Sequence, residues 1–260
     1  MKLWYGSSVG RSFHPDNVTD LIRLFTCGRP IYWRPVSGDA LIERSRSISA
    51  TRFLKSDAEV MLSIDTDIRF DHHAALQICD QAVTHDIVVG AYTTRSPMRS
   101  FVTSEVYAHQ PIEFATDPTP VPIKWGATGF MAVHRRVYER LAESLPLCHE
   151  GEWLEHYPFY LPFVVDEDGK PIMLSEDYAL CERARQAGFG VFLNPAVRLG
   201  HIGDYCYRLE DMTIARPRDT FPIRFERLTD GSPAQFRVER PDYDELERAA
   251  DEAQLAQLSA

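Results

Sequence analysis

The chain has few cysteines, and their spacing does not match that of a cysteine-ligated zinc site. The 260 residues include five cysteines, and no two of them form a C-x-x-C pair. This spacing argues against a cysteine-ligated zinc site, and an odd number of thiols is typical of proteins that keep them reduced. We therefore expect five free thiols and a cytoplasmic location.

Long apolar runs are also lacking. The first ten residues, MKLWYGSSVG, hold no apolar stretch of signal-peptide length. No later stretch approaches the roughly 18 to 20 apolar residues that cross a bilayer. We therefore expect no membrane span.

Positive charge is in the minority, with 28 Lys and Arg against 38 Asp and Glu and a formal net charge of -10. A negative field repels polyphosphate backbones, so we expect no bulk nucleic-acid binding. One nucleotide held by a metal ion and a few arginines stays compatible with this charge, because such contacts act at short range.

The apolar residues that are present predict an α/β fold. They make up 44% of the chain, enough for one sizeable core with a short accessory region. Strand-length runs and helically spaced stretches alternate up to residue 91, which predicts a mostly parallel sheet flanked by helices on both faces. The expected strands are 2–5, 31–36, 59–64 and 87–91, and the expected helices are 17–25, 40–54 and 72–83, with Asp39 and Asp71 as caps of the last two.

The pattern is less regular after residue 91. The proline-rich stretch 93–122 is interpreted as a long loop or lid. Further strands are expected at 130–133, 171–174 and 191–199, helices at 135–141 and 175–187, and a hairpin turn at Asp168-Gly169. The division that we expect is a main domain, 1–208, and an extension, 209–260, with an acidic helix at 243–258 that mediates self-association or is simply solvated.

An acidic triplet, Asp65-Thr66-Asp67, follows a strongly apolar strand. If the chain stays extended there, Asp65 and Asp67 point the same way, beyond the carboxyl ends of the strands where α/β sheets bind ligands. Two hard oxygen donors suit Mg²⁺ or Mn²⁺ bridging a diphosphate. The alternative is a solvated acidic loop, because Asp-x-Asp is a common pattern.

Other motifs carry two interpretations each. Glu176 and Asp177 fall in the first turn of an expected helix, where they serve as an acid–base pair or only complement the helix dipole. His201, flanked by glycines, is a metal ligand or a structural histidine. Gly126 and Gly129 allow close backbone approach to a ligand or form an ordinary turn.

Basic and aromatic side chains complete the candidate set. Arg44, Arg46 and Arg95 have the guanidinium fork that matches a diphosphate, although most arginines lie on surfaces. His72-His73 lacks the i, i+4 spacing of a helical metal pair. The aromatic stretch either stacks on sugar rings or belongs to the core; its members are Trp153, Tyr157, Phe159, Tyr160 and Phe163.

The order of these motifs is more specific than any one of them. LIERSRS, SIDTDI, VGAY, KWGATGFMAVHRR, LSEDYALC and GHIG follow one another within residues 1–208. This series resembles GT-A fold glycosyltransferases, closest to the family-2-like bacterial and phage enzymes, with a fainter likeness to fungal mannan-polymerase mannosyltransferases. The resemblance implies a divalent metal ion, Mn²⁺ or Mg²⁺, and a UDP- or GDP-sugar donor.

The resemblance also implies roles for individual residues. Asp65 and Asp67 match the Asp-x-Asp element, and His201 matches the metal-binding histidine near the C-terminal end of the domain. Asp177 matches the catalytic base of the acidic pair that it forms with Glu176. The loop from Gly126 through Gly129 to Phe130 matches the glycine loop near the donor sugar, and the turn around Ser7 and Ser8 would lie near the nucleotide.

The expected reaction is transfer of a sugar to an acceptor hydroxyl. A glycan is the first candidate for the acceptor, and a modified nucleobase is the second. Two other functions are compatible with a similar sheet. One is a sugar-phosphate nucleotidyltransferase, for which Gly6 to Arg11 is a poor glycine-rich loop. The other is a non-catalytic nucleotide-sugar-binding module, against which the intact acids argue.

Overall fold

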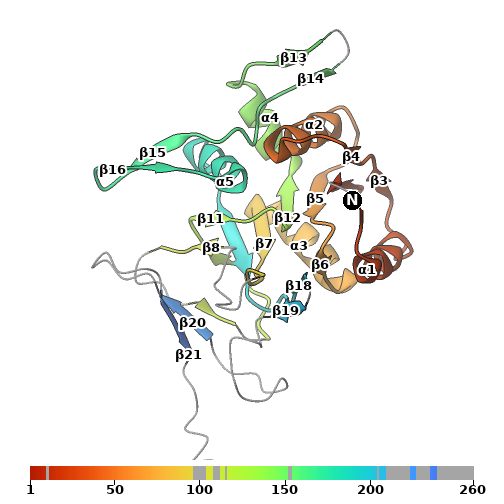
Figure 1. Cartoon of the computed structure of the whole chain (residues 1–260), viewed down its shortest axis with the longest axis vertical. Helices are drawn as coiled ribbons and strands as arrows, with labels where there is room; N and C mark the ends of the chain where they lie inside the picture. The colour runs from red at the N-terminus through yellow and green to blue at the C-terminus, as the bar shows by residue number, and fades with distance from the viewer. Residues whose placement is uncertain are drawn as a thin grey trace, which may run out of the picture.

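A seven-stranded sheet forms the centre of the protein, with strand order β10-β17-β7-β12-β5-β1-β3 (Figure 1). The computed structural model describes residues 1–9, 12–95, 104–107, 112–114, 116–151, 154–203, 205–208, 223–226 and 235–238. The strands of this sheet are β1 Leu3–Gly6, β3 Ile31–Trp33, β5 Val60–Ile64, β7 Ile87–Gly90, β10 Val121–Pro122, β12 Phe130–His134 and β17 Val191–Asn194.

The sheet is mixed but mostly parallel. β1 pairs in parallel with both β3 and β5, and β17 pairs in parallel with β7. β12 lies antiparallel between β5 and β7, so these two strands share one direction. β10 is antiparallel to β17 at the edge, which leaves five of the seven strands pointing the same way. The α/β prediction is therefore confirmed.

Helices cover both faces of the sheet. One core cluster joins α1 (Pro15–Phe25) and α3 (His72–His85) to strand side chains such as Leu62. The other joins α2 (Ile42–Leu54), α4 (Arg135–Ala142) and α5 (Glu176–Gln186) to side chains such as Met61. Successive residues of β5 thus enter opposite cores, which explains why the strand is apolar throughout.

Two of the expected helix boundaries can be judged by their local contacts. Asp71 caps α3 as predicted, because its Oδ1 accepts a hydrogen bond from the backbone N–H of His73 at 2.6 Å. The prediction that Asp39 caps α2 is wrong. The helix begins at Ile42 with Leu41 at the N-cap, and the carboxylate of Asp39 instead accepts from the N–H of Leu41 and from Arg44.

The stretch 93–122 is not a simple loop. Its described residues include β8 (Ser104–Glu105), β9 (Ile112–Glu113) and β10, which completes the central sheet. β8 pairs with β11 (Trp125–Gly126). Strands of two residues leave no periodicity in a sequence, and Pro122 is tolerated in β10 because this is an edge strand. Most of the other residues of the expected lid lie outside the described part.

Two expected strands are each divided. The first contains β3 and then β4 (Val36–Ser37), which pairs with β2 (Ser8–Val9). The second, expected at 191–199, ends early with β17 at Asn194, and the chain then leaves the sheet before it forms β18 (Gly200–Ile202). β18 lies between β6 (Ile68–Arg69) and β19 (Cys206–Arg208) in a separate three-stranded sheet.

Hairpins extend from the body of the fold (Figure 1). β15 (Val164–Glu167) pairs with β16 (Lys170–Met173) across Asp168 and Gly169, whose φ values are 52° and 78°, so the expected hairpin turn is confirmed. β13 (Cys148–Glu150) pairs with β14 (Leu154–His156).

The aromatic stretch around residue 160 belongs mainly to the core. Phe159 and Tyr160 are fully buried, and the hydroxyls of Tyr160 and Tyr138 lie 2.6 Å apart. Tyr157 and Phe163 pack partly against the same core, whereas Trp153 lies outside the described residues.

Two strands follow residue 208 in the described part of the chain, β20 (Ile223–Glu226) and β21 (Gln235–Val238). They pair with each other, and β20 also pairs with β9. The extension therefore shares backbone hydrogen bonds with the domain before it, and the boundary after residue 208 stays a prediction. The expected acidic helix at 243–258 lies outside the described residues.

The sequence predicts neither disulfide bonds nor a membrane-spanning helix. All five cysteines are free thiols. Among the described residues, no helix is both long and apolar enough to cross a membrane.

Arg135 joins α4 to the end of α2. Its guanidinium donates to the carbonyls of Ala58, Leu54, Phe53 and Ser56 at 2.6 to 3.1 Å. Leu54 and Phe53 are the last residues of α2, where carbonyls lack a partner in a following helical turn, and Phe53 also accepts from Ser56. We predict that Arg135→Met lowers the free energy of unfolding by about 2 to 3 kcal/mol in urea denaturation, because these part-buried acceptors lose their donor.

The matched control on the same helix is Arg140→Met. Arg140 makes an exposed ion pair with Glu143, so its removal should change stability by less than about 0.5 kcal/mol. Equal losses in the two variants would contradict the role given to Arg135.

Candidate functional site

The Asp65-Thr66-Asp67 triplet forms a turn rather than an extended segment. It follows β5 directly, and the N–H of Ile68 donates to the carbonyl of Asp65 at 3.2 Å. The extended-backbone argument for two carboxylates that face one spot therefore does not apply, because side chains alternate in this way only along extended backbone. Asp65 and Asp67 instead take part in two separate networks at the carboxyl edge of the sheet.

The first network is centred on the buried guanidinium of Arg46, on α2. Its Nη2 donates to Oδ1 and Oδ2 of Asp65 at 2.9 and 3.2 Å, and its Nη1 donates to Oε1 of Glu176 at 2.6 Å. Burial alone would lower the pKa of Arg46, but the charges of Asp65, Glu176 and Asp177 outweigh it and raise the pKa. This cation is therefore permanent and joins α2, the end of β5 and the start of α5.

The second network joins Asp67 to His201 and Arg95. Oδ2 of Asp67 lies 3.7 Å from Nε2 of His201 and 3.0 Å from Nη1 of Arg95. Burial opposes ionisation of Asp67, but His201 and Arg95 outweigh it and lower the pKa of this carboxyl group. Asp67 thus carries a negative charge beside a ring nitrogen.

The orientation of His201 suits a metal ligand. Its Nδ1 lies 2.8 Å from the carbonyl oxygen of Thr93, and because a carbonyl only accepts, Nδ1 must carry the proton. In the neutral ring the lone pair is then on Nε2, the atom that faces Asp67, whereas the contact that lowers the pKa of Asp67 needs a proton on that nitrogen. Such a second hydrogen bond commonly orients a metal-binding histidine.

Backbone pairing brings His201 to the triplet. β6 starts one residue after Asp67 and pairs with β18, where His201 lies opposite Ile68. The N–H of Ile202 also donates to the carbonyl of Asp67 at 2.7 Å. The association of Asp67 with His201, residues that are distant in sequence, therefore depends on main-chain hydrogen bonds.

Tyr92 lies next to both networks and was given no role from the sequence. Its buried ring packs edge-on against the ring of His201, with 5.2 Å between the ring centroids. Burial raises the pKa of its hydroxyl, and the charges of Asp65 and Asp177 add to this effect. Tyr92 follows β7 at the carboxyl edge of the sheet, so the rule that singled out Asp65 applies to it as well.

Glu176 and Asp177 begin α5, as expected. Burial and the charge of Asp177 raise the pKa of Glu176, although Arg46 opposes them. The hydroxyl of Ser175 donates to Asp177 rather than capping the helix through its own oxygen. Asp177 makes no direct bond to Arg46 in the described structure, which leaves it more available than Glu176 as a proton acceptor.

Packing accounts for both glycines of the 126–129 loop. A Cβ on Gly126 would lie 2.8 Å from a methyl group of Val89, and one on Gly129 would lie 2.2 Å from the hydroxyl of Tyr92. The hydroxyl of Thr128, between them, is buried without a hydrogen-bond partner among the described residues.

Ser7 lies at the carboxyl edge of the sheet, whereas Arg44 is held by acidic side chains on another side of α2. Ser7 follows β1 at the same edge of the sheet as Asp65, where its buried hydroxyl accepts from Nε1 of Trp33 at 3.1 Å. Arg44 forms ion pairs with Asp39 at 2.7 Å and Glu150 at 3.0 Å. Since it is two residues before Arg46, it points about 200° around the helix from that residue.

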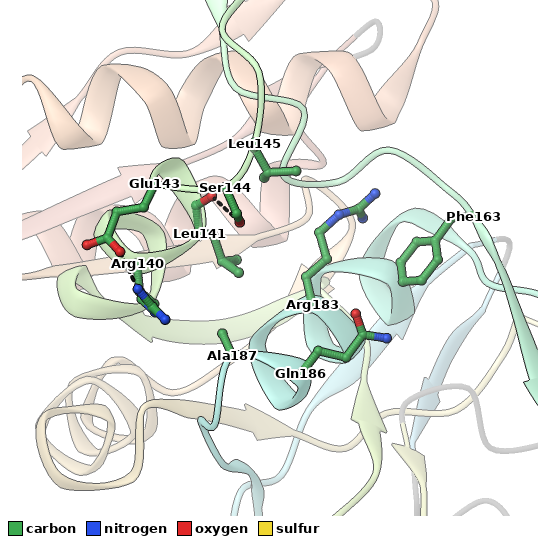
Figure 2. A pocket seen from close by; sticks show the side chains of 9 residues that line it. All are labelled: Arg140, Leu141, Glu143, Ser144, Leu145, Phe163, Arg183, Gln186 and Ala187. Atoms are coloured by element: carbon green, nitrogen blue, oxygen red, sulfur yellow. Dashed lines mark hydrogen bonds and ion pairs between the residues drawn. The ribbon is translucent and has the colours of Figure 1, made fainter.

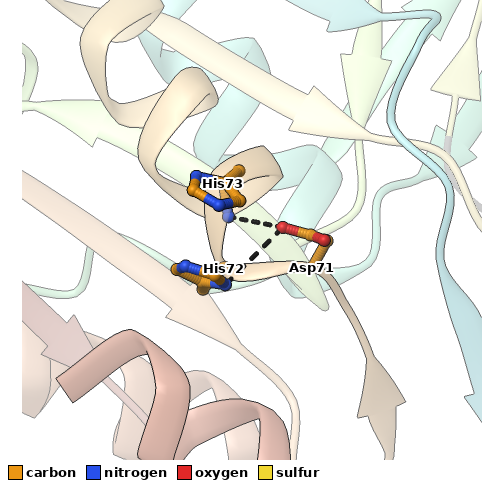
Figure 3. A group of neighbouring side chains, drawn as sticks. All are labelled: Asp71, His72 and His73. Atoms are coloured by element: carbon orange, nitrogen blue, oxygen red, sulfur yellow. Dashed lines mark hydrogen bonds and ion pairs between the residues drawn. The ribbon is translucent and has the colours of Figure 1, made fainter. Parts of the chain in front are cut away.

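A second group of potential metal ligands lies at the start of α3 (Figure 3). Asp71, His72 and His73 each offer a donor atom, all within 4.8 Å of one another, and they are the only such trio in the described part of the chain. Asp71 already caps the helix, and the positive end of the helix dipole disfavours a cation there.

One large hollow is distant from these acids. It has a volume of about 640 Å³ and lies between the end of α4 and the end of α5, with Leu141, Phe163 and Arg183 among its walls (Figure 2). The acids Glu176 and Asp177 are at the opposite end of α5. The volume of this hollow alone therefore does not identify the site.

Comparison with known proteins gives the fold only. No model of a known family and no curated protein matches the sequence. The chain is similar to the crystal structure of A197 from STIV, with a TM-score of 0.50 and 12% identity over 92% of this chain and 100% of that one. At this identity the likeness shows a shared fold.

Two looser matches have lower TM-scores. The structure of GalNAc-T7 with UDP, GalNAc and Mn²⁺ matches at 0.43 and 12% identity, over 83% of this chain and 45% of that one. The 4-diphosphocytidyl-2C-methyl-D-erythritol synthase of Anaerococcus prevotii matches at 0.31 and 11% identity, over 57% and 78%. These scores are too low to transfer a site.

We predict that Arg46→Gln lowers the free energy of unfolding by about 3 kcal/mol, because Asp65 and Glu176 then lose their shared cation. Water reaches the partly exposed Asp65 and thereby reduces the cost of leaving its charge without a partner. The loss should be larger at pH 8 than at pH 5. The folded-state pKa of Glu176, already raised, rises further without Arg46, so stability falls as pH rises above the unfolded value.

Arg95→Gln is the control for this measurement, because Arg95 is half exposed and, among the described residues, pairs with one carboxylate only. It should cost less than about 1 kcal/mol. A pH-independent loss in Arg46→Gln would show that the carboxylates do not depend on this cation.

Proposed function

We propose that this chain is a metal-dependent glycosyltransferase that moves a sugar from a UDP- or GDP-sugar to an acceptor hydroxyl. The observation that carries the proposal is the meeting of distant motifs at the carboxyl edge of the sheet. Arg46 links Asp65 to Glu176, and β18 holds His201 beside Asp67. The resemblance to GT-A enzymes supports the same function.

Asp67 and His201 would hold the metal ion. A carboxylate oxygen and an imidazole nitrogen 3.7 Å apart, with the nitrogen lone pair directed toward the carboxylate, fit Mn²⁺ or Mg²⁺. The bound ion would offset the charge of the leaving diphosphate. Asp65 is the weaker candidate ligand, since both of its oxygens bond to Arg46.

Asp177 would act as the general base. Its carboxylate takes the proton of the acceptor hydroxyl, whose oxygen then bonds to the anomeric carbon of the donor. The bond from that carbon to the diphosphate breaks, and its electron pair leaves with the nucleoside diphosphate. Glu176, held by Arg46, would position the start of α5 for this step.

Arg95 would bind the diphosphate. Its side chain is half exposed and already meets Asp67, so a donor phosphate can replace that carboxylate as its partner. Ser7 follows β1 at the same edge and would lie near the nucleotide. For Arg44 we propose no donor contact, because Asp39 and Glu150 hold it.

The acceptor is proposed to be a glycan hydroxyl, with a modified nucleobase as the second candidate. A cytoplasmic location and self-association through residues 209–260 are further proposals that follow from the sequence. Each can be tested separately from the transfer reaction.

The metal site can be tested by Mn²⁺ binding, measured from the electron paramagnetic resonance signal of free Mn²⁺. We predict that Asp67→Asn and His201→Gln each weaken binding at least about tenfold, because each removes one proposed ligand. Asp65→Asn should weaken it less, because Asp65 is paired with Arg46.

The control is the double variant His72→Gln/His73→Gln, which disables the trio of potential ligands at the start of α3. It should bind Mn²⁺ as the unaltered protein does. Loss of binding in this variant, with retention in Asp67→Asn, would place the ion at the start of α3.

The reaction can be tested by donor turnover over a panel of UDP- and GDP-sugars with Mn²⁺. We predict that Asp177→Asn lowers the rate of transfer or donor hydrolysis by about 10² to 10⁴-fold while nucleotide-sugar binding persists. Asp168→Asn, the same chemical change in the exposed hairpin turn, should leave the rate unchanged.

Two results would contradict this function. Release of pyrophosphate from a nucleoside triphosphate and a sugar phosphate would make the protein a nucleotidyltransferase. Binding of a nucleotide sugar without any turnover would make it a binding module.

A further inference from the structure

A second hollow lies apart from the acidic site, at the exposed edge strand β3 and the end of α2. Its volume is about 390 Å³, within the size range of small-molecule sites. Tyr32 and Arg34 line it from β3 and the residue after it, while Arg52 and Lys55 line it from the last turn of α2 and its C-cap.

The two arginines of this hollow are exceptional in the described part of the chain. Every other arginine whose side chain is described interacts with a neighbouring group, in most cases through a hydrogen bond or an ion pair, whereas Arg34 and Arg52 have neither. Both of them face the same hollow. Two guanidinium groups without acidic partners repel each other, and an anion between them would relieve this repulsion.

The neighbouring charges do not neutralise these arginines. Asp57, an acid in the wall of the hollow, binds the ammonium group of Lys2. Lys55 is paired with Glu155 at 2.6 Å. The hollow therefore keeps two uncompensated positive charges, on a chain whose formal net charge is -10.

The remaining wall is aromatic. Tyr32 is 40% exposed, so the ring is accessible to a ligand, and the nearly buried Trp4 is its partner in the adjacent strand β1. A planar group can stack on an exposed tyrosine ring, while guanidinium forks match the oxygens of a phosphate.

We propose that this hollow binds a small phosphate monoester that carries a planar ring. Arg34 and Arg52 hold the dianionic phosphate, and Tyr32 packs against the ring. The site does not depend on the proposed glycosyl transfer, because it shares no residue with the acidic networks.

Isothermal titration with phenyl phosphate and with inorganic phosphate tests this proposal. EDTA in the buffer removes divalent ions, so that the Asp67–His201 pair cannot retain either probe through a metal. The unaltered protein should bind one phenyl phosphate saturably and bind inorganic phosphate more weakly. Arg34→Gln/Arg52→Gln should weaken phenyl phosphate binding at least about tenfold, because two charge-assisted contacts are lost.

Two further variants separate local contacts from net charge. Arg29→Gln/Arg140→Gln makes the same change in charge at arginines paired elsewhere, with Asp80 and Glu143, and should bind both probes normally. Tyr32→Ala should remove the preference for phenyl phosphate and keep the binding of inorganic phosphate.

Three outcomes would overturn the proposal. They are the absence of saturable binding to the unaltered protein, equal binding by the Arg34→Gln/Arg52→Gln variant, and equal weakening in the two double variants. The last outcome would mean that arginine charge anywhere on the surface has the same effect.

Discussion

The arrangement of the acidic edge depends on one buried guanidinium. Arg46 lies where the end of β5 and the start of α5 would otherwise bring the carboxylates of Asp65 and Glu176 together without compensation. Like charges in a partly dry environment repel strongly, and a charge without a partner is costly to bury. The cation from α2 allows both acids to stay at this edge and thereby fixes the start of α5, where Asp177 lies.

The two acids of the triplet are held by different kinds of force. Asp65 is held by side-chain ion pairing, which is sensitive to the charges around it. Asp67 lies beside His201 because β6 and β18 pair through their backbones, which no side-chain substitution removes directly. Because the triplet forms a turn, Asp65 belongs to the ion-pair network of Arg46, whereas Asp67 lies beside His201 as a potential metal ligand.

Local features of the fold could be predicted from the sequence, and contacts between distant residues could not. The apolar strand β5 and the cap at Asp71 follow from rules that act within a few residues. The turn at Asp65 depends on one backbone hydrogen bond, and the position of β10 depends on a partner strand about 70 residues later. Arg46 was expected at a diphosphate, but its burial between two acids is a property of the folded chain.

The pairing of β18 with β6 also determines when the site can form during synthesis. His201 must meet Ile68, which leaves the ribosome 133 residues earlier (201 minus 68). At typical elongation rates this separation is on the order of ten seconds. Throughout that interval the nascent chain presents Asp67 without its histidine partner, so the Asp67–His201 contact exists only once nearly all of the first 208 residues have been made.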